Sequence, residues 1–561
     1  MKFKFTKVFF TNICLLFGIS ITSMIFGNPT FGTTDDNNLS GFISGSYTGN
    51  SEERLIFIQP VLAKLFHYIQ LIFPSIEIYS WVLLIITILS LSFLLSIIAY
   101  KEEFKSIFNI LMYLSVLPLL IWFTISPTYT AAALITALCS LLSHVLIISC
   151  FMESKVMYIF SILLMTFAFL LRPESFIGIL ILLAPFYFYY IFYLKNFNKK
   201  FFYYFILSFA WFFFILLINI QLQNVQNKNW AQYDKWNQMR HEMQHRKSEK
   251  YLIELAQNNT WSIPEYHLFM DLSFGDPKFF NINWIEKGYN HTASKRSILK
   301  TENYNLIEIL NGASTILKQY YGLIIFQVVS FIVILSLINL KLKQSLTIIF
   351  IGWSSLLISL VYIIVFLHLT ERVMLVILSS PIFILVTLLK ISNVKYNEHK
   401  LYTIITLTLI PFILYLVQPW GVYNQYNENI KKKQFDQQTA IELLEFNDKA
   451  IYVGPGVTEL FDSNNPYFQS SFETLPKYIT AGSWDTFSPH WENRKNLLGI
   501  KEESIYDSLL GKDIFWASFG TPDTAYLIEL FLEEKKGVDI WREEILNTST
   551  GLKIFRYGIT K

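Results

Sequence analysis

The sequence has few charged residues and very little cysteine. Asp, Glu, Lys and Arg make up 16% of its 561 residues, whereas soluble domains carry roughly 25%. The three cysteines, Cys14, Cys139 and Cys150, fall in or at the edge of apolar runs, so they provide no disulfide framework and no Cys/His zinc spacing. The net charge is only +3, and most lysines lie in short loops between apolar runs, so the composition does not indicate a nucleic-acid partner.

Apolar residues are abundant instead, at 53% of the chain, and 17% of all residues are aromatic. Several runs reach the roughly 18 to 20 apolar residues that a helix needs to cross a bilayer. The sequence therefore predicts an α-helical polytopic membrane protein with about eleven transmembrane helices. The frequent Ile, Phe, Asn and Lys residues are typical of an AT-rich bacterial genome. The expected spans are 8–26, 78–100, 106–123, 128–150, 156–171, 175–194, 201–221, 319–340, 344–366, 373–390 and 401–418.

The lysines indicate the orientation of these spans. They cluster on alternate loops, beginning with Lys2, Lys4 and Lys7 at the N-terminus, and the positive-inside rule places such loops in the cytoplasm. No small-residue cleavage site follows Phe26, so we expect an uncleaved first helix. This predicts a multi-pass protein of the bacterial cytoplasmic membrane with its N-terminus inside. The first outer loop (27–77), a large outer loop (222–318) and the C-terminal region then lie outside.

Within the outer regions, the sequence predicts three kinds of structure. Residues 54–73 have polar side chains on one helical side and apolar ones on the other, which predicts an amphipathic helix in the membrane interface. The large outer loop has helical spacing. A transmembrane domain, 1–418, should be followed by a small extracytoplasmic α/β domain, 419–561, expected to bind the acceptor or to support the site. Its strand candidates are 450–453, 514–517 and 553–557, with a helix at 524–534.

The cytoplasmic loops are short and contain no Gly-rich loop that could cradle phosphates. Any chemistry should therefore occur on the outer face, where nucleotide-activated substrates are absent. A donor of a chemical group would have to arrive in the lipid.

Asp35 and Asp36 are the first candidates for such chemistry, because they form an adjacent acidic pair just beyond the first apolar run. Arg172 and Arg372 stand at the outer ends of apolar spans, and His368 lies one helical turn before Arg372. Arginine is well suited to clamp a phosphate through its forked donors. Both arginines could also simply extend to the membrane interface, and the acidic pair could belong to a solvated turn that caps a helix.

Aromatic and polar residues of the large outer loop are the second group of candidates. Trp230, Tyr233, Asn237 and Arg240 share one helical face, and a second helical stretch begins near Trp261 and Glu265. Exposed Trp and Tyr side chains can stack on sugar rings, although anchoring at the membrane interface is a commoner use.

These residues carry a resemblance to a known family. The acidic pair after the first helix, the run Ser44–Gly49, the pairs Phe57-Ile58 and Phe73-Pro74, and the two aromatic patterns of the large outer loop resemble bacterial C-type (GT-C) membrane glycosyltransferases of a poorly characterised group. The resemblance implies a polyprenyl-phosphate sugar donor, transfer with inversion, and an acidic residue that acts as base on the acceptor hydroxyl.

With such a donor, we expect Asp35 or Asp36 to be catalytic and Arg172, Arg372 and His368 to bind the donor phosphate. We expect the acceptor, a cell-envelope glycan or glycopolymer, or the sugar to be bound by Trp230, Tyr233, Arg240, Trp261 and Glu265. Some members of the family need a divalent metal, Mg²⁺ or Mn²⁺, and Asp35 and Asp36 would be its ligands here. Two alternatives stay open: a transporter or flippase of lipid-linked saccharides, and a polysaccharide polymerase.

Overall fold

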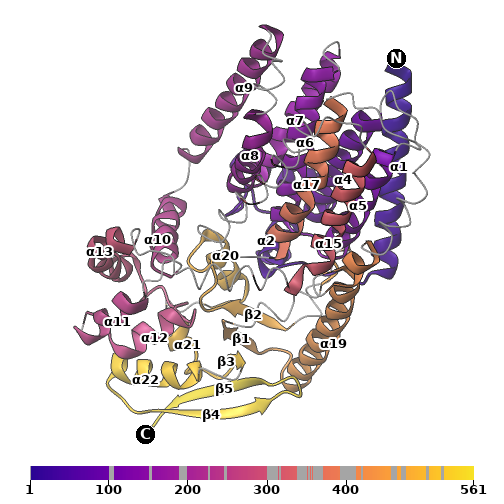
Figure 1. The fold of residues 1–561 in the computed structure, drawn as a ribbon. Helices are drawn as coiled ribbons and strands as arrows, with labels where there is room; N and C mark the ends of the chain where they lie inside the picture. Colours follow the sequence, from indigo (N-terminus) through magenta and orange to yellow (C-terminus); the bar gives the residue numbers. More distant parts are fainter. Residues whose placement is uncertain are drawn as a thin grey trace.

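The computed structural model shows a predominantly helical protein with a small C-terminal sheet (Figure 1). The structure describes residues 2–99, 107–150, 154–188, 199–224, 228–244, 249–258, 260–299, 314, 318–337, 350, 354, 357, 371–391, 412–418, 421–455, 464–468, 476–500, 504–519 and 523–560.

Apolar helices form a bundle at one end of the molecule. Its described members are α1 (Lys2–Phe26), α4 (Ile78–Ala99), α5 (Ile107–Ile125), α6 (Tyr129–Cys150), α7 (Lys155–Leu171), α8 (Pro173–Phe188), α9 (Lys199–Asn224), α15 (Tyr321–Leu337) and α17 (Glu371–Ile391). Each coincides with an expected span. Among the described residues, three helices are long and apolar enough to cross a membrane: Phe5–Phe26, Ile78–Ala99 and Tyr129–Ile148. Shorter apolar helices accompany them. The expected span 344–366 lies almost wholly, and the span 401–418 largely, outside the described residues.

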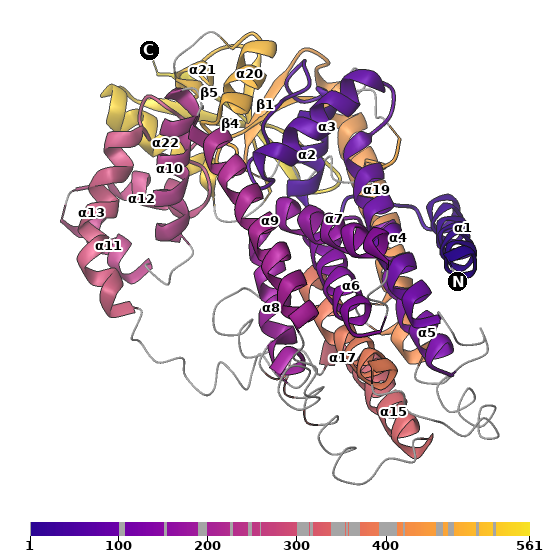
Figure 2. The same ribbon diagram turned by 90° about the horizontal axis from the view of Figure 1, so that it is seen from above.

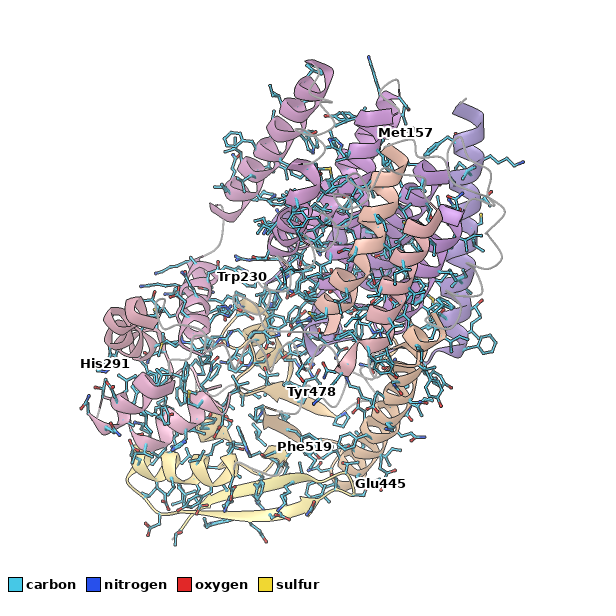
Figure 3. The ribbon with its side chains drawn as sticks, viewed as in Figure 1. Met157, Trp230, His291, Glu445, Tyr478 and Phe519 are labelled. Atoms are coloured by element: carbon cyan, nitrogen blue, oxygen red, sulfur yellow. The ribbon has the colours of Figure 1, made fainter. Side chains whose placement is uncertain are left out.

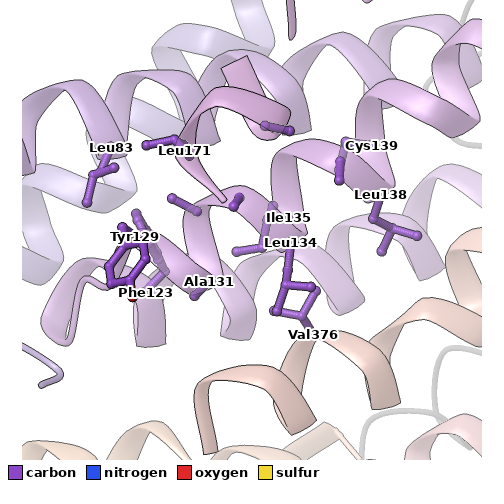
Figure 4. Packing of buried hydrophobic residues seen from close by; sticks show 14 of the residues in the cluster. Leu83, Phe123, Tyr129, Ala131, Leu134, Ile135, Leu138, Cys139, Leu171 and Val376 are labelled. Atoms are coloured by element: carbon purple, nitrogen blue, oxygen red, sulfur yellow. The ribbon is translucent and has the colours of Figure 1, made fainter. Parts of the chain in front are cut away.

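Helix α6 runs through the centre of the bundle. All of its residues from Tyr129 to Ile148 are buried, and it packs against α4, α7, α8 and α17. Small residues such as Ala131, Ala132 and Ala137 allow neighbouring backbones to approach it closely. Figure 4 shows this packing, with Leu134 and Leu138 of α6 directed toward Val376 of α17. The position of α6 fixes Tyr129, its first residue, at one end of the bundle.

The segment after α1 contains two helices, α2 (Thr34–Ser44) and α3 (Pro60–Ile72). The expected amphipathic helix was too long at its N-terminal end, because Pro60 occupies the first turn and the residues before it are not helical. His67 and Gln70 of α3 point into the protein, whereas Leu65, Tyr68, Leu71 and Ile72 are exposed. Leu62, Ala63 and Phe66 are buried as well. Apolar side chains therefore lie on both sides of the helix, and the exposed ones are suited to a membrane interface.

The other end of the molecule contains the large outer loop and the C-terminal region. The loop forms α10 (Lys228–Gln244), α11 (Glu249–Gln257), α12 (Ile263–Met270) and α13 (Ile282–Leu299). After α19 (Val422–Phe446), five strands form one sheet in the order β2-β1-β3-β5-β4. Strands β1, β2 and β3 are parallel, and β5 is antiparallel to both β3 and β4. The elements are β1 (Ile451–Gly454), β2 (Lys477–Thr480), α20 (Pro489–Leu497), α21 (Ile505–Ser508), β3 (Ile514–Phe519), α22 (Thr524–Lys536), β4 (Ile540–Asn547) and β5 (Leu552–Ile559).

Both faces of this sheet are covered, and its residues alternate between two cores. Tyr452 and Phe515 belong to the core that is continuous with the bundle. Val453 and Trp516, one residue further along each strand, belong to a second core shared with α10 to α13. Figure 2 shows α10 to α13 beside the C-terminal elements. The large outer loop and the C-terminal region therefore form one packed layer against the end of the bundle.

The expected α/β character of the C-terminal region is confirmed. The three strand candidates correspond to β1, β3 and β5, and the helix candidate corresponds to α22. Strands β2 and β4 were not predicted. Lys477 begins β2, and β4 contains three consecutive charged residues, Arg542, Glu543 and Glu544, so neither has the continuous apolar run of a buried strand.

Candidate functional site

The site begins where the chain passes along the end of the bundle and enters α2. The Thr30 amide donates to the Ile125 carbonyl at 3.1 Å, and the Gly32 amide donates to the Pro127 carbonyl at 3.3 Å. A Cβ atom on Gly32 would lie 2.4 Å from the Thr128 side chain, so this close approach requires glycine. Thr33 then caps α2, accepting from the Asp36 amide. The acidic pair therefore occupies the first turn of a helix held against α6.

Asp36 is completely buried and lies at the centre of a hydrogen-bond network. Its Oδ1 atom accepts from the Tyr79 hydroxyl and from the Tyr129 amide, each at 2.7 Å. Its Oδ2 atom accepts from the Thr33 hydroxyl at 2.5 Å. Burial raises the pKa of Asp36 to about 6, although Arg372 and the three hydrogen bonds oppose the rise. Both oxygens of Asp36 therefore accept hydrogen bonds from protein groups, and the side chain links Thr33, Tyr79 and Tyr129.

Asp35 differs from Asp36 in its burial and in its hydrogen bonds. It is half-buried, and none of the described residues makes a hydrogen bond with its carboxylate. The Tyr129 hydroxyl lies within electrostatic range of Asp35, Asp36, Arg172 and Arg372. Asp35 is therefore a carboxylate without a hydrogen-bond partner among the described residues, and it adjoins Tyr129 and Thr33, the residues that the two arginines contact. A second carboxylate, the exposed Glu174, lies 4.0 Å from Arg172 Nε.

Each arginine donates a hydrogen bond to a residue that is itself hydrogen-bonded to Asp36. The Arg372 guanidinium donates to the Thr33 hydroxyl oxygen at 3.1 Å. The Arg172 guanidinium donates to the Tyr129 hydroxyl at 3.2 Å and to Thr130, and it lies 5.2 Å from the centre of the Tyr129 ring. Both arginines are half-buried. Their contacts with the site are more specific than extension to a membrane interface would require.

Three candidates of the large outer loop lie on α10 and face the same region. The Trp230 ring packs edge-on against Tyr233, and the Arg54 guanidinium lies 4.2 Å from the Trp230 ring centre. Arg240 is buried and donates to Asn237 at 2.7 and 3.0 Å. Burial lowers the pKa of Arg240, while Tyr233, Asp485 and Asp35 raise it. Arg240 is thus near enough to Asp35 for their charges to interact.

A loop of the C-terminal region completes the surroundings. Residues 481–488, between β2 and α20, carry Trp484 and Asp485. The Tyr233 hydroxyl donates to the Trp484 carbonyl at 2.5 Å. The Trp484 ring lies 4.7 Å from that of Phe57, which stacks parallel to Tyr129 at 6.0 Å. A row of aromatic rings therefore leads from the C-terminal region to the arginines. Figure 3 shows Trp230 and Tyr478 at this end of the molecule and Met157 at the opposite end of the bundle.

The 481–488 loop is held by very close backbone contacts. A Cβ atom on Gly482 would lie 1.7 Å from the Leu272 carbonyl oxygen, and one on Gly275 would lie 2.4 Å from the Ala481 Cα atom. Only glycine fits at either position, because the neighbouring atoms belong to the backbone. The large outer loop thereby fixes the loop that carries Trp484.

The first outer loop is fastened to the same C-terminal elements. The Arg494 guanidinium donates to the carbonyls of Tyr47 and Tyr478 at 3.2 and 3.0 Å. His490 Nε2 lies 2.8 Å from the Arg54 carbonyl oxygen, and His490 Nδ1 lies 3.5 Å from a Glu52 carboxylate oxygen. These contacts give the C-terminal region a direct part in shaping the site.

Two other sequence candidates make their contacts elsewhere in the fold. Trp261 is 1% exposed and stacks on Trp284 at 4.0 Å in the second core, so its faces are covered by protein. Glu265 closes the capping box of α12 and pairs with Lys535 at 2.8 Å. The structure therefore places Trp261 and Glu265, both expected to bind the acceptor or the sugar, in packing and capping contacts away from Asp35. His368 lies outside the described residues.

Asp35 is the member of the acidic pair that could bind a divalent metal. Such a metal takes several oxygen ligands, but both oxygens of Asp36 accept hydrogen bonds from protein groups. Asp35 alone is available. Within the described ranges, no three His, Cys, Asp or Glu side chains form a group that could hold a metal ion.

Sequence reasoning missed Tyr79, Tyr129, Trp484 and Asp485. Tyr79 and Tyr129 stand at the first turns of apolar helices, at the same end of the bundle as the acidic pair. Polar aromatic residues at such positions were a usable signal. Trp484 and Asp485 offered none, because only the tertiary fold brings residue 484 to residue 57.

No family model and no curated protein sequence matches this chain. Among solved structures, the chain is similar to ArnT from Cupriavidus metallidurans in the apo state. The two sequences are 10% identical, the match covers 97% of each chain, and the TM-score is 0.36. A likeness of this degree carries no argument about activity.

Proposed function

We propose that the chain is a membrane glycosyltransferase. It transfers a sugar from a polyprenyl-phosphate donor to a hydroxyl group of a cell-envelope glycan at the outer face of the membrane. The observation that carries this proposal is the placement of Asp35 in the first turn of α2, next to the Thr33 hydroxyl that Arg372 contacts and the Tyr129 hydroxyl that Arg172 contacts, at the end of an apolar bundle. A carboxylate and two cations at that position suit a reaction on a phosphate carried by a lipid.

Each residue has a defined task in the reaction. Asp35 accepts the proton of the acceptor hydroxyl as its oxygen attacks the anomeric carbon from the face opposite the phosphate. The bond between that carbon and the phosphate oxygen breaks, and its electron pair leaves with the polyprenyl phosphate. Arg172 and Arg372 stabilise the charge that develops on the leaving phosphate. The sugar is transferred with inversion, and no separate acid is needed because the phosphate is a good leaving group.

Asp36 holds in place the two residues that contact the arginines. It links Thr33, which contacts Arg372, to the backbone of Tyr129, whose hydroxyl contacts Arg172. A single buried carboxyl group thus sets the positions of both arginines relative to Asp35. The first outer loop and the 481–488 loop then enclose the side from which an acceptor would approach.

The distribution of lysines supports an outward-facing site. The loops assigned to the cytoplasm carry most of them, and the site lies at the end of the bundle next to the large outer loop and the sheet. Nucleotide sugars are absent outside the membrane, so a lipid-linked sugar is the donor class available there.

The test uses the full-length chain in lipid nanodiscs. Undecaprenyl-phosphate-linked monosaccharides are supplied one at a time, and release of undecaprenyl phosphate is measured by mass spectrometry. We expect the wild type to consume at least one donor and Asp35→Asn to be slower by roughly 10²–10⁴-fold, the range for loss of a general base. Asp448→Asn, at an exposed position outside the site, is the matched control. Equal rates in the wild type and Asp35→Asn would refute the assignment.

A transporter of lipid-linked saccharides has less support. Ion-coupled transporters use ionisable residues within the spans, and His144, a residue of this kind in α6, hydrogen-bonds Ser161 at 2.9 Å and Ser208 at 3.3 Å. These contacts join α6 to α7 and α9, which is a structural use of the side chain.

A further inference from the structure

Asn38 is a buried polar residue of α2 that takes no part in the hydrogen bonds around Asp36. It lies on α2, one helical turn after Asp35, and is 1% exposed. Neither its amide oxygen nor its amide nitrogen has a hydrogen-bond partner among the described residues. Burying a primary amide without partners is unfavourable. An unsatisfied amide so close to the available carboxylate needs an explanation.

Helix geometry shows which way Asn38 points. Asp36 and Ser40 contact Tyr79 and Glu77, so their side of α2 faces α4. At 100° per residue, Asn38 projects to the opposite side and shares its face with Asp35 and Phe42.

Phe42 identifies what lies on that side. Its ring packs edge-on against Trp484 at 6.0 Å and stacks on His490 at 4.3 Å. The amide of Asn38 therefore faces the 481–488 loop. Thr486 on this loop has a second buried polar atom, Oγ1, without a partner among the described residues.

We propose that Asn38 binds the acceptor, an inference that rests on the proposed function. A primary amide offers both a donor and an acceptor, which matches a hydroxyl group that does the same. Sugars carry such hydroxyls on neighbouring carbons. Asp35 takes the proton of the attacking hydroxyl, and Asn38 holds an adjacent hydroxyl of the same acceptor. The acceptor thus lies along α2, between this helix and the loop that carries Trp484.

The first test compares two buried asparagines in the ligand-free protein. Asn429 is also buried, but its amide donates to the carbonyls of Asn28 and Ile125 at 3.2 and 2.9 Å and accepts from Gln425 at 3.0 Å. We expect Asn429→Ala to lower the melting temperature in nanodiscs clearly, because three hydrogen bonds are lost. We expect Asn38→Ala to lower it much less, or to raise it. An equal fall in both variants would mean that Asn38 is structural and would overturn the proposal.

The second test separates acceptor use from donor use. Donor consumption is measured with water alone and then with methyl glycopyranosides as acceptors at subsaturating concentrations. We expect Asn38→Ala to hydrolyse the donor within about twofold of the wild type but to transfer to the glycosides at least about tenfold more slowly, the effect of one good hydrogen bond. Asn38→Ser, which keeps a donor and an acceptor, should recover part of the transfer.

The two proposals fail in different ways. An unchanged ratio of transfer to hydrolysis in Asn38→Ala would overturn the role of Asn38 while leaving the glycosyltransferase intact. A wild type that hydrolyses the donor but uses none of the glycosides would overturn the acceptor assignment. A wild type that consumes no donor would refute the proposed function itself, and the melting comparison would still decide whether Asn38 is a structural residue.

Discussion

Asp36 makes a quantitative prediction about stability and pH. Its pKa is about 6 in the folded protein, raised by burial from an ordinary value of 3.8. Between these values the folded state binds more protons than the unfolded state, so stability falls as pH rises from about 4 to about 6. A difference of about two pKa units corresponds to roughly 3 kcal/mol, at about 1.4 kcal/mol per unit.

The perturbation is Asp36→Asn, which keeps the shape of the side chain but removes the titrating group. Its oxygen can still accept from Tyr79 and from the Tyr129 amide, while its nitrogen can donate to Thr33. We expect the variant to lack the decline between pH 4 and 6, and to be as stable as the wild type or more so at pH 7.5. Glu77 is also buried, with a pKa raised to about 7, but it is present in both proteins and drops out of the comparison.

The assay is thermal unfolding of both proteins in nanodiscs at half-unit steps from pH 4 to pH 8. The quantity of interest is the difference between wild type and Asp36→Asn at each pH. If the wild type instead gained stability relative to Asp36→Asn as pH rose, the carboxylate would be stabilised more by Arg372 and its hydrogen bonds than it is destabilised by burial. That result would refute the reasoning.

Three further predictions concern the arginines, the 481–488 loop and the orientation. Arg172→Lys and Arg372→Lys should each reduce donor turnover by about tenfold or more at matched expression, because a lysine loses the forked geometry; wild-type turnover in both would leave the phosphate without a partner. Gly482→Ala should abolish activity or expression because its Cβ meets the Leu272 carbonyl, whereas Gly178→Ala, with nothing within 4 Å, should be silent; equal behaviour would contradict the backbone contact. A cysteine at exposed Asn258 should react with an impermeant thiol reagent on intact cells and one at Lys155 should not; the reverse pattern would invert the topology.

The helices of the bundle could be predicted from sequence because each needs only a local apolar run. The same holds for β1, β3 and β5. Local patterns also singled out Asp35, Asp36, Arg172 and Arg372, since charged residues next to apolar spans are few. They could not distinguish Asp35 from Asp36, because the difference is set by Tyr79 and Tyr129, which are distant in sequence.

Local spacing also could not place Trp261 and Glu265. Their spacing is equally compatible with an exposed sugar platform and with a buried helix start. The decision depends on Trp284 and Lys535, which cover them in the fold. Asn38 lies only three residues after Asp35, but its lack of hydrogen-bond partners among the described residues depends on the tertiary fold.

The fastening of the first outer loop to the C-terminal region has a consequence for biosynthesis. Tyr47 and Arg54 lie in the first tenth of the chain, whereas their partners Asp485, His490 and Arg494 follow 436 to 447 residues later. The early helices can enter the membrane while these partners are still untranslated. The site is therefore completed only near the end of synthesis, and a prematurely terminated chain would insert without acquiring a finished site.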